Sequence, residues 1–177
     1  TFLRAMRTLA NLMPEAQGWI AGPEDEDPEY AAECRALIHS LQLDDHVRFL
    51  GFQKIADLLP KVGVIVLSSI SEALPLVLLE GFAAGVPAVS TDVGSCRQLI
   101  EGLDDDDRAL GRAGEVVGIA NPEALGRAVA DLLRDPERWH AAQQAGIRRV
   151  EAYYTQERMF ASYRNLYESL LNQEETP

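Results

Sequence analysis

A short apolar run, "VGVIVLSS" at residues 62–69, constrains the fold more than any other feature of the chain. Nearly every residue in it is β-branched or apolar, which is typical of a strand covered on both faces. Around it, short strand patterns alternate with amphipathic helical patterns through the first two thirds of the chain. This alternation predicts an α/β fold, a parallel sheet wrapped by helices.

The expected elements follow from the spacing of apolar residues and from the positions of glycine and proline. Strands are expected at 18–22, 46–51, 62–69, 87–91 and 114–118. Helices are expected at 2–13, 30–41, 55–59, 76–84, 95–100, 122–134, 136–152 and 156–171, followed by a frayed tail.

Composition and charge exclude several classes of protein. The chain has 177 residues, of which 47% are hydrophobic, enough for one domain with a well-buried core. Its net charge of -12 disfavours binding to nucleic acid and to anionic membranes. The acidic runs at 24–27 and 104–107 are expected to be solvated loops. A metal site is the weaker alternative for them, because they lack the spaced ligands and turn glycine of a calcium loop.

The two cysteines, Cys34 and Cys96, lie far apart in helical contexts, so no disulfide is expected and the compartment is expected to be reducing. No apolar run has the length of a membrane span, and the first 13 residues lack the features of a signal peptide. We therefore expect a cytoplasmic protein. Because the chain opens directly onto a helical pattern, we also expect it to be a piece of a longer protein.

Two glutamates, Glu72 and Glu80, are separated by seven residues in the stretch after the apolar strand. Pro75 fits the first position of a helix, and Gly85 fits the left-handed position just past its end. Glu72 is then in the loop, while Glu80 is in the second turn and leans back toward the helix start. In an open parallel sheet, ligands bind at this carboxyl edge, and a helix N-terminus suits phosphate.

Such a site would hold a diphosphate at the backbone of Leu76 and Val77, with a carboxylate on each side to accept hydrogen bonds from hydroxyls. This arrangement fits a nucleotide sugar. The alternative is that both acids are surface residues that complement the helix dipole. The apolar neighbours of Glu80 predict that this helix is largely buried, which favours the ligand site because an unpaired charge is rarely buried. These neighbours are Leu76, Val77, Leu78, Leu79, Phe82, Ala83 and Ala84.

The stretch "SSISEALPLVLLEGFAAGVPAVSTDVGSCRQLIEG" resembles the E-x7-E segment of family-4 retaining glycosyltransferases of the GT-B fold. Its details "SSISE", "LLE" and "TDVGSCR" are most similar to the PelF type, which builds the Pel exopolysaccharide. The resemblance covers essentially the whole chain, including "VRFLGFQKIADLLPK" and "YYTQERMFASYRNLYESLL".

The resemblance implies a role for each glutamate: Glu72 stands beside the donor sugar as the catalytic carboxylate, and Glu80 binds the ribose of the nucleotide. Ala73 departs from the glycine that usually follows the first glutamate, where the backbone closely approaches the sugar. The remaining substrate-binding positions are implied at the backbone of Leu74, Leu76 and Val77 for sugar and diphosphate, and at Gly51, Phe52 and Gln53 for the base.

The function implied is that of the donor-binding domain of a retaining glycosyltransferase, which transfers a hexose from a UDP-sugar, with UDP-glucose favoured, to a growing polysaccharide. The resemblance implies that residues 1–155 form a Rossmann-like nucleotide-sugar-binding domain, with a parallel sheet and helices in three layers. Residues 156–177 would form a helix and tail that cross toward an N-terminal domain. That absent domain would bind the glycan acceptor, so the fragment alone is expected to be inactive. Neither a metal nor another cofactor is expected, and association with a membrane polysaccharide-synthesis complex stays open.

In the family, the first strand of this domain and a following arginine and lysine precede the helix with which the chain begins. We therefore expect a gap between the strands at 18–22 and 62–69, so that they either pair directly or receive another chain between them. The last helix either crosses to the other domain or packs on its own, and an uncovered apolar face would promote self-association. Its apolar residues are Met159, Phe160, Tyr163, Leu166, Tyr167, Leu170 and Leu171.

Two other functions remain open. A non-hydrolysing sugar-nucleotide epimerase shares the GT-B architecture, although "TDVGSCRQLIEG" favours the transferase. A non-catalytic nucleotide-binding or assembly module would keep the core and would have no need of Glu72.

Overall fold

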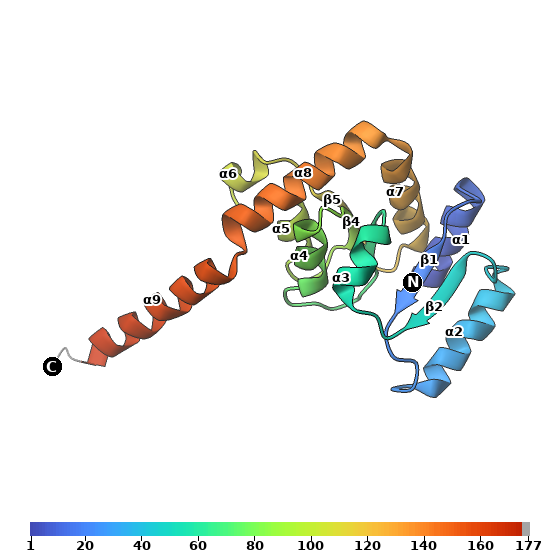
Figure 1. Ribbon diagram of the computed structural model, residues 1–177, viewed down its shortest axis with the longest axis horizontal. Coiled ribbons are helices and arrows are strands. Elements are labelled where there is room, and N and C mark those ends of the chain that lie inside the picture. The colour runs from blue at the N-terminus through green and yellow to red at the C-terminus, as the bar shows by residue number, and fades with distance from the viewer. Residues whose placement is uncertain (175–177) are drawn as a thin grey trace.

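The computed structural model describes residues 1–174 and has parallel strands alternating with helices, as the sequence predicts (Figure 1). The strands are β1 (Gly18–Ala21), β2 (Val47–Gly51), β3 (Ile65–Leu67), β4 (Ala88–Thr91) and β5 (Gly114–Val117). The helices are α1 (Phe2–Leu12), α2 (Pro28–Ser40), α3 (Ile55–Leu58), the 3-10 turn η1 (Leu59–Lys61), α4 (Leu76–Ala83), α5 (Cys96–Glu101), α6 (Asp105–Arg108), α7 (Pro122–Arg134), α8 (Pro136–Tyr153) and α9 (Gln156–Glu174).

The strands form two separate parallel sheets, β1–β2 and β3–β4–β5. The expected α/β class is confirmed. Direct pairing of β1 with β3 is wrong, because these strands belong to different sheets. Insertion of another chain between them stays a prediction.

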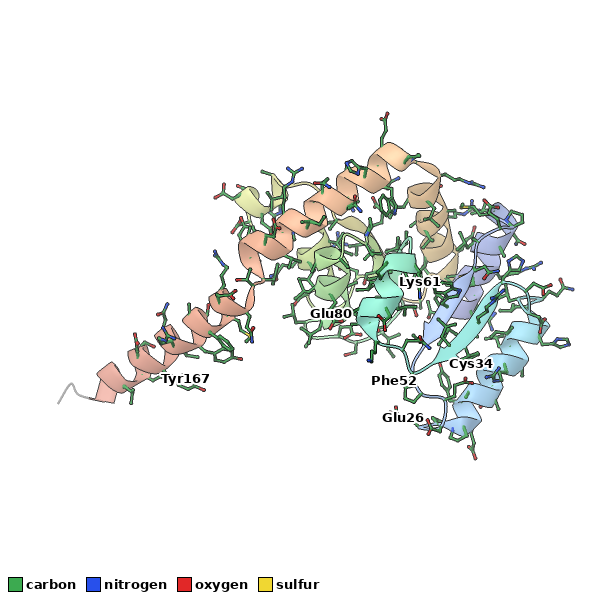
Figure 2. The ribbon with its side chains drawn as sticks, viewed as in Figure 1. Glu26, Cys34, Phe52, Lys61, Glu80 and Tyr167 are labelled. Carbon is green, nitrogen blue, oxygen red and sulfur yellow. The ribbon has the colours of Figure 1, made fainter. Side chains whose placement is uncertain are left out.

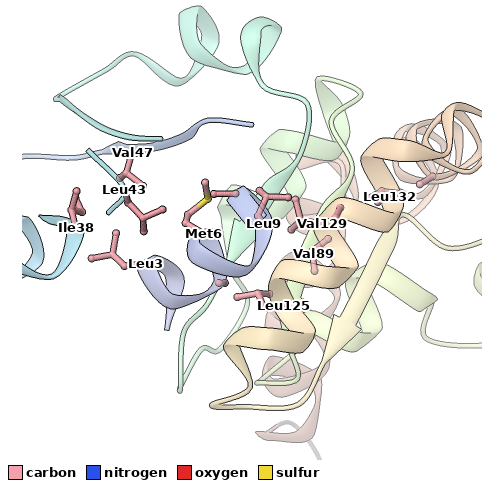
Figure 3. Packing of buried hydrophobic residues seen from close by; sticks show 14 residues of the cluster. Leu3, Met6, Leu9, Ile38, Leu43, Val47, Val89, Leu125, Val129 and Leu132 are labelled. Atoms are coloured by element: carbon pink, nitrogen blue, oxygen red, sulfur yellow. The ribbon is translucent and has the colours of Figure 1, made fainter. Parts of the chain in front are cut away.

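Helix α1 lies between the two sheets and packs closely on α7. A Cβ added to Gly126 of α7 would stand 2.8 Å from Cβ of Thr8 on α1, so the two backbones approach more closely than a larger residue allows. Figure 3 shows the apolar face of α1 in contact on one side with residues around β2 and on the other with residues around β4 and α7. The labelled residues of this core are Leu3, Met6, Leu9, Ile38, Leu43, Val47, Val89, Leu125, Val129 and Leu132.

The acidic run at 104–107 differs from its prediction. It forms the helical turn α6, which Asp104 caps by accepting a hydrogen bond from the backbone N–H of Asp107 at 2.9 Å. The turn directs the side chain of Asp107 inward, where it is 1% exposed and pairs with the buried Arg149 of α8. The expectation of a solvated loop is therefore wrong for Asp107, because an arginine distant in sequence compensates its charge.

Helix α9 extends away from the rest of the molecule (Figure 1). Its apolar side chains are between 47% and 65% exposed, and Tyr163 stacks on Tyr167 with ring centroids 6.5 Å apart. Packing of this helix on its own domain is thus wrong, while its crossing toward another domain stays a prediction. The tail at 175–177 lies outside the described residues.

The structure also bears on the cysteines and on membrane-spanning segments. Cys34 and Cys96 are both free, which confirms the absence of a disulfide between them. Within residues 1–174, no helix has the length and apolar character needed to cross a membrane.

Candidate functional site

The loop at 68–75 connects the end of β3 to the start of α4 and carries Glu72. This side chain is half-buried, and Ser69 Oγ donates a hydrogen bond to its Oε1 at 2.7 Å. A carboxylate has about four acceptor positions. One bond from the described residues leaves most of the acceptor capacity of Glu72 open to a ligand.

The end of β4 and the turn that follows it contact the same loop at two points. Thr91 Oγ1 donates to the backbone carbonyl of Ser69 at 2.6 Å. The backbone N–H of Ser95 donates to the carbonyl of Ala73 at 2.9 Å. Sequence reasoning did not assign these contacts to the site. A signal for them was available, because the "TDVGS" stretch lies at the carboxyl end of a strand, where ligands bind in a parallel sheet.

The start of α4 presents free backbone donors. The helix begins at Leu76, as the expected range has it, but Pro75 occupies the N-cap with an extended backbone and not the first helical position. Proline has no side-chain oxygen that could cap the first N–H groups. The left-handed conformation expected for Gly85 is confirmed by its φ of 75°. Leu74 lies just before the helix, and Leu76 and Val77 are its first two residues.

Glu80 is placed in the second turn of α4, as predicted, but its expected burial is wrong because the side chain is exposed. Only one face of the helix packs into the core, through Leu78 and Phe82. Leu76 is 64% exposed on the open side. Burial therefore gives no support for a ligand at Glu80. The support that is left is the position of Glu80 beside the free N–H groups at the start of α4.

The residues implied for the base are the last residue of β2 and the two that follow it. Gly51 has a left-handed φ of 62°, Phe52 is 80% exposed and Gln53 donates from Nε2 to the carbonyl of Leu50 at 2.7 Å. Figure 2 shows Phe52 on the loop after β2 and Glu80 on α4. The predicted residues thus form two sets at the carboxyl ends of strands in different sheets.

A groove of about 880 Å³ lies between β1 and β3, where the two sheets do not pair. Its wall includes Ser69, the partner of Glu72, but none of the eight predicted site residues. The acidic run at 24–27 is a solvated loop, as predicted, and it also contributes to the wall of this groove. A diphosphate is disfavoured beside such an acidic wall. The acidic residues of the groove are Glu24, Glu26, Asp27 and Glu33.

Among residues 1–174, no group of three or more histidine, cysteine or acidic side chains is arranged to hold a metal ion. Independence from metal stays a prediction.

Residues 1–149 match the family model described as "Glycosyl transferases group 1". The chain belongs to this family. The GT-B glycosyltransferase family expected from the E-x7-E segment is therefore confirmed, while the PelF type stays a prediction.

Among curated relatives of this group 1 chain is the N-acetyl-alpha-D-glucosaminyl L-malate synthase of Bacillus anthracis, which is 32% identical over 82% of the chain and 36% of the relative. A lipopolysaccharide core biosynthesis mannosyltransferase, LpcC of Rhizobium leguminosarum bv. viciae, is 28% identical over 94% of the chain and 46% of its own length. The chain thus spans between a third and a half of these relatives.

Solved structures share its fold. Sucrose-phosphate synthase from Thermosynechococcus elongatus superposes with a TM-score of 0.80 at 22% identity, covering 97% of the chain and 43% of that structure. HepE of Anabaena in complex with UDP-glucose superposes with a TM-score of 0.76 at 19% identity, covering 96% of the chain and 44% of that structure.

Proposed function

We propose that this chain is the donor-binding part of a retaining glycosyltransferase that transfers a hexose from a UDP-sugar to a growing polysaccharide. The observation that carries the proposal is the placement of two carboxylates around one helix start. Glu72 is held in the loop before α4 by Ser69, and Glu80 is exposed in the second turn. Between them are the free N–H groups of a helix capped only by Pro75.

Each part of a nucleotide sugar has a partner in this arrangement. The diphosphate binds the backbone N–H groups of Leu76 and Val77, where the helix dipole favours negative charge. Glu80 accepts hydrogen bonds from the ribose hydroxyls. Glu72 and the backbone of Leu74 face the sugar. The base lies against the loop formed by Gly51, Phe52 and Gln53.

This arrangement accounts for catalysis without a protein nucleophile or a bound metal. As the bond to the anomeric carbon breaks, negative charge moves onto the departing diphosphate. The N–H groups at the start of α4 are already directed at that charge, so they stabilise the transition state more than the bound donor. Glu72 orients the sugar so that the acceptor oxygen bonds to the anomeric carbon as the bond to the diphosphate breaks, and the acceptor's proton passes to the departing diphosphate.

UDP-glucose is the favoured donor because HepE, a structure of the same fold, is in complex with UDP-glucose. The polysaccharide acceptor and the PelF type rest on the sequence resemblance. In this proposal the acceptor binds the part of the protein outside this sequence, toward which residues 156–177 cross from the donor domain at 1–155. The chain alone is then inactive in transfer, and the protein works in the cytoplasm at a membrane complex.

The donor site is tested by titrating this chain with UDP, ADP and GDP while following backbone amide shifts. We expect selective shifts from UDP around Gly51 and Leu76. Glu80→Ala should weaken UDP binding roughly tenfold or more, because a charged hydrogen-bond acceptor is lost. Glu137→Ala, which removes an exposed glutamate from α8, is the matched control. Equal binding of all three nucleotides, or unchanged binding in Glu80→Ala, would contradict the donor site.

Catalysis is tested by Glu72→Gln in a form of the protein that performs transfer. We expect transfer to fall while folding and UDP binding persist, because the amide keeps the shape of the side chain and removes its charge. A non-catalytic nucleotide-binding module would tolerate the change without loss.

A further inference from the structure

The loop that carries Glu72 is tied to the turn after β4 by a series of hydrogen bonds. Thr91 Oγ1 donates to the carbonyl of Ser69 at 2.6 Å, and Ser69 Oγ donates to Glu72 Oε1 at 2.7 Å. On the far side of the glutamate, the N–H of Ser95 donates to the carbonyl of Ala73 at 2.9 Å. The carboxylate thus stands between two attachment points.

Apart from Pro75 at its end, the loop has no buried residue. None of the residues at 68–74 is buried, and Ile70 and Leu74 are 75% and 44% exposed. Loops without buried contacts open at low free energy. The position of Glu72 therefore depends on the hydrogen bonds that the loop receives.

Thr91 provides a rigid support for one of these bonds. It is the last residue of β4, which pairs with β3 on one side and β5 on the other, and it is 1% exposed. Its hydroxyl is also 3.4 Å from the carbonyl of Leu67, at the end of β3. Because Thr91 is buried, loss of its hydroxyl would remove the hydrogen bond that this strand end gives to the carbonyl of Ser69.

Gly94 lets the turn approach the loop. A Cβ at this position would meet the carbonyl oxygens of Glu72 and Ala73, the second at 2.7 Å. The φ of Gly94 is also left-handed, at 49°. Any side chain here would push the backbone of Glu72 away from β4, and the bond between Ser95 and Ala73 would be the first to break.

We propose that Thr91 and Gly94 are positioning residues that set the place of the Glu72 carboxylate in the donor site. Thr91 holds the carbonyl of Ser69, and with it the hydroxyl that orients the carboxylate. Gly94 sets how close the glutamate backbone comes to the sheet. The assignment to the donor sugar rests on the proposed function, whereas the support of the loop rests on the contacts alone.

Two pairs of variants test the proposal. Thr91→Val keeps the shape of the side chain and removes the hydroxyl, while Thr91→Ser keeps the hydroxyl. Gly94→Ala adds the clashing Cβ. Its control is Gly111→Ala, which has the same kind of left-handed strain at a φ of 96° and whose Cβ would meet only Ala145, at an ordinary 3.6 Å.

The first measurement is hydrogen exchange of the Ser95 amide in the ligand-free chain, because this amide is bonded directly to the loop. We expect exchange to quicken roughly tenfold in Thr91→Val and Gly94→Ala. Thr91→Ser and Gly111→Ala should exchange like the unmodified chain. If Thr91→Val matches Thr91→Ser and Gly94→Ala matches Gly111→Ala, the support of the loop is refuted.

The second measurement compares affinities for UDP-glucose and UDP in the same variants. A merely structural defect weakens both ligands together. We expect Thr91→Val and Gly94→Ala to weaken UDP-glucose roughly tenfold and UDP by less than about twofold, with recovery in Thr91→Ser. A looser loop with an unchanged ratio of the two affinities would overturn the role in sugar placement. If the unmodified chain binds no UDP, the proposed function fails, and the exchange experiment still decides whether the two residues hold the loop.

Discussion

The acidic turn at 104–107 and the two-glutamate segment both place carboxylates beside a short helix, but in opposite environments. Asp107 is buried, accepts a hydrogen bond from the N–H of Leu103 at 2.9 Å and pairs with Arg149. Glu80 is exposed, and Glu72 receives one hydrogen bond from the described residues. A carboxylate whose acceptors are used within the protein stabilises the fold, whereas one with open acceptors is available to a ligand.

Arg149 shows how complete the internal arrangement is. Its side chain is 0% exposed and ties α8 to α5, α6 and the loop before β5. Besides Asp107, it donates hydrogen bonds to the backbone carbonyls of Leu99, Ile100, Asp107 and Gly111. Because every buried side-chain nitrogen and oxygen in the described residues has a partner, this pair has no capacity for a ligand.

The largest effect is expected from Arg149→Met. The change leaves Asp107 buried without its cation, which should lower the free energy of unfolding by about 3–5 kcal/mol. Arg148→Met is the matched control, because Arg148 is exposed on the same helix, and it should change stability by less than about 0.5 kcal/mol. Urea denaturation measures both. Equal stability of the two variants would show that the buried pair of Asp107 and Arg149 does not stabilise the fold.

A smaller change in stability is expected from variants of the two-glutamate segment. Glu80→Ala and Glu72→Gln should each alter the free energy of unfolding by less than about 1 kcal/mol, because neither carboxylate is buried in an ion pair. Urea denaturation without nucleotide checks this. A loss comparable to that of Arg149→Met would show that these acids maintain the fold and would sharply weaken their assignment to a ligand.

The smallest effect concerns Tyr154, a half-buried group at the end of α8 whose hydroxyl accepts a hydrogen bond from Gln98 Nε2 at 2.9 Å. Burial raises the pKa of Tyr154 above its ordinary value. The folded chain then holds this proton more tightly than the unfolded chain does. The resulting stability is fully present below about pH 10 and declines as the pH rises through the folded pKa.

Tyr154→Phe should therefore show a shallower loss of stability in alkaline solution, by roughly a few tenths of a kcal/mol, because partial exposure limits the contribution. Urea denaturation at several alkaline pH values measures the difference. The pKa values of Tyr30 and Tyr153 are also raised, so some pH dependence should remain. A variant with the same pH profile as the unmodified chain would show that burial of this hydroxyl does not matter.

Much of the fold could be predicted because its signals are local. The run at 62–69 is apolar enough to require cover on both faces, and β3 lies within it. Proline and glycine mark the two ends of α4 to within one residue, since each restricts its own backbone. The placement of Glu72 in a loop and Glu80 in the second turn follows from the same two residues.

What could not be predicted depends on neighbours that are distant in sequence. The prediction that Glu80 is buried is wrong because apolar composition does not reveal which face of a helix packs against the core. Asp107 was taken as solvated because Arg149 lies 42 residues further along the chain. The support that Thr91 provides depends on the place of β4 at the centre of its sheet.

The sequence by itself determined the alternation of strands and helices, the bounds of the site loop and the family. These depend on backbone preferences and on a periodicity that each segment carries within itself. Only the tertiary structure decided which carboxylates are used internally and which remain open, and how the Glu72 loop is held. Burial and hydrogen bonding are properties of pairs of segments, and those pairs come together only when the chain folds.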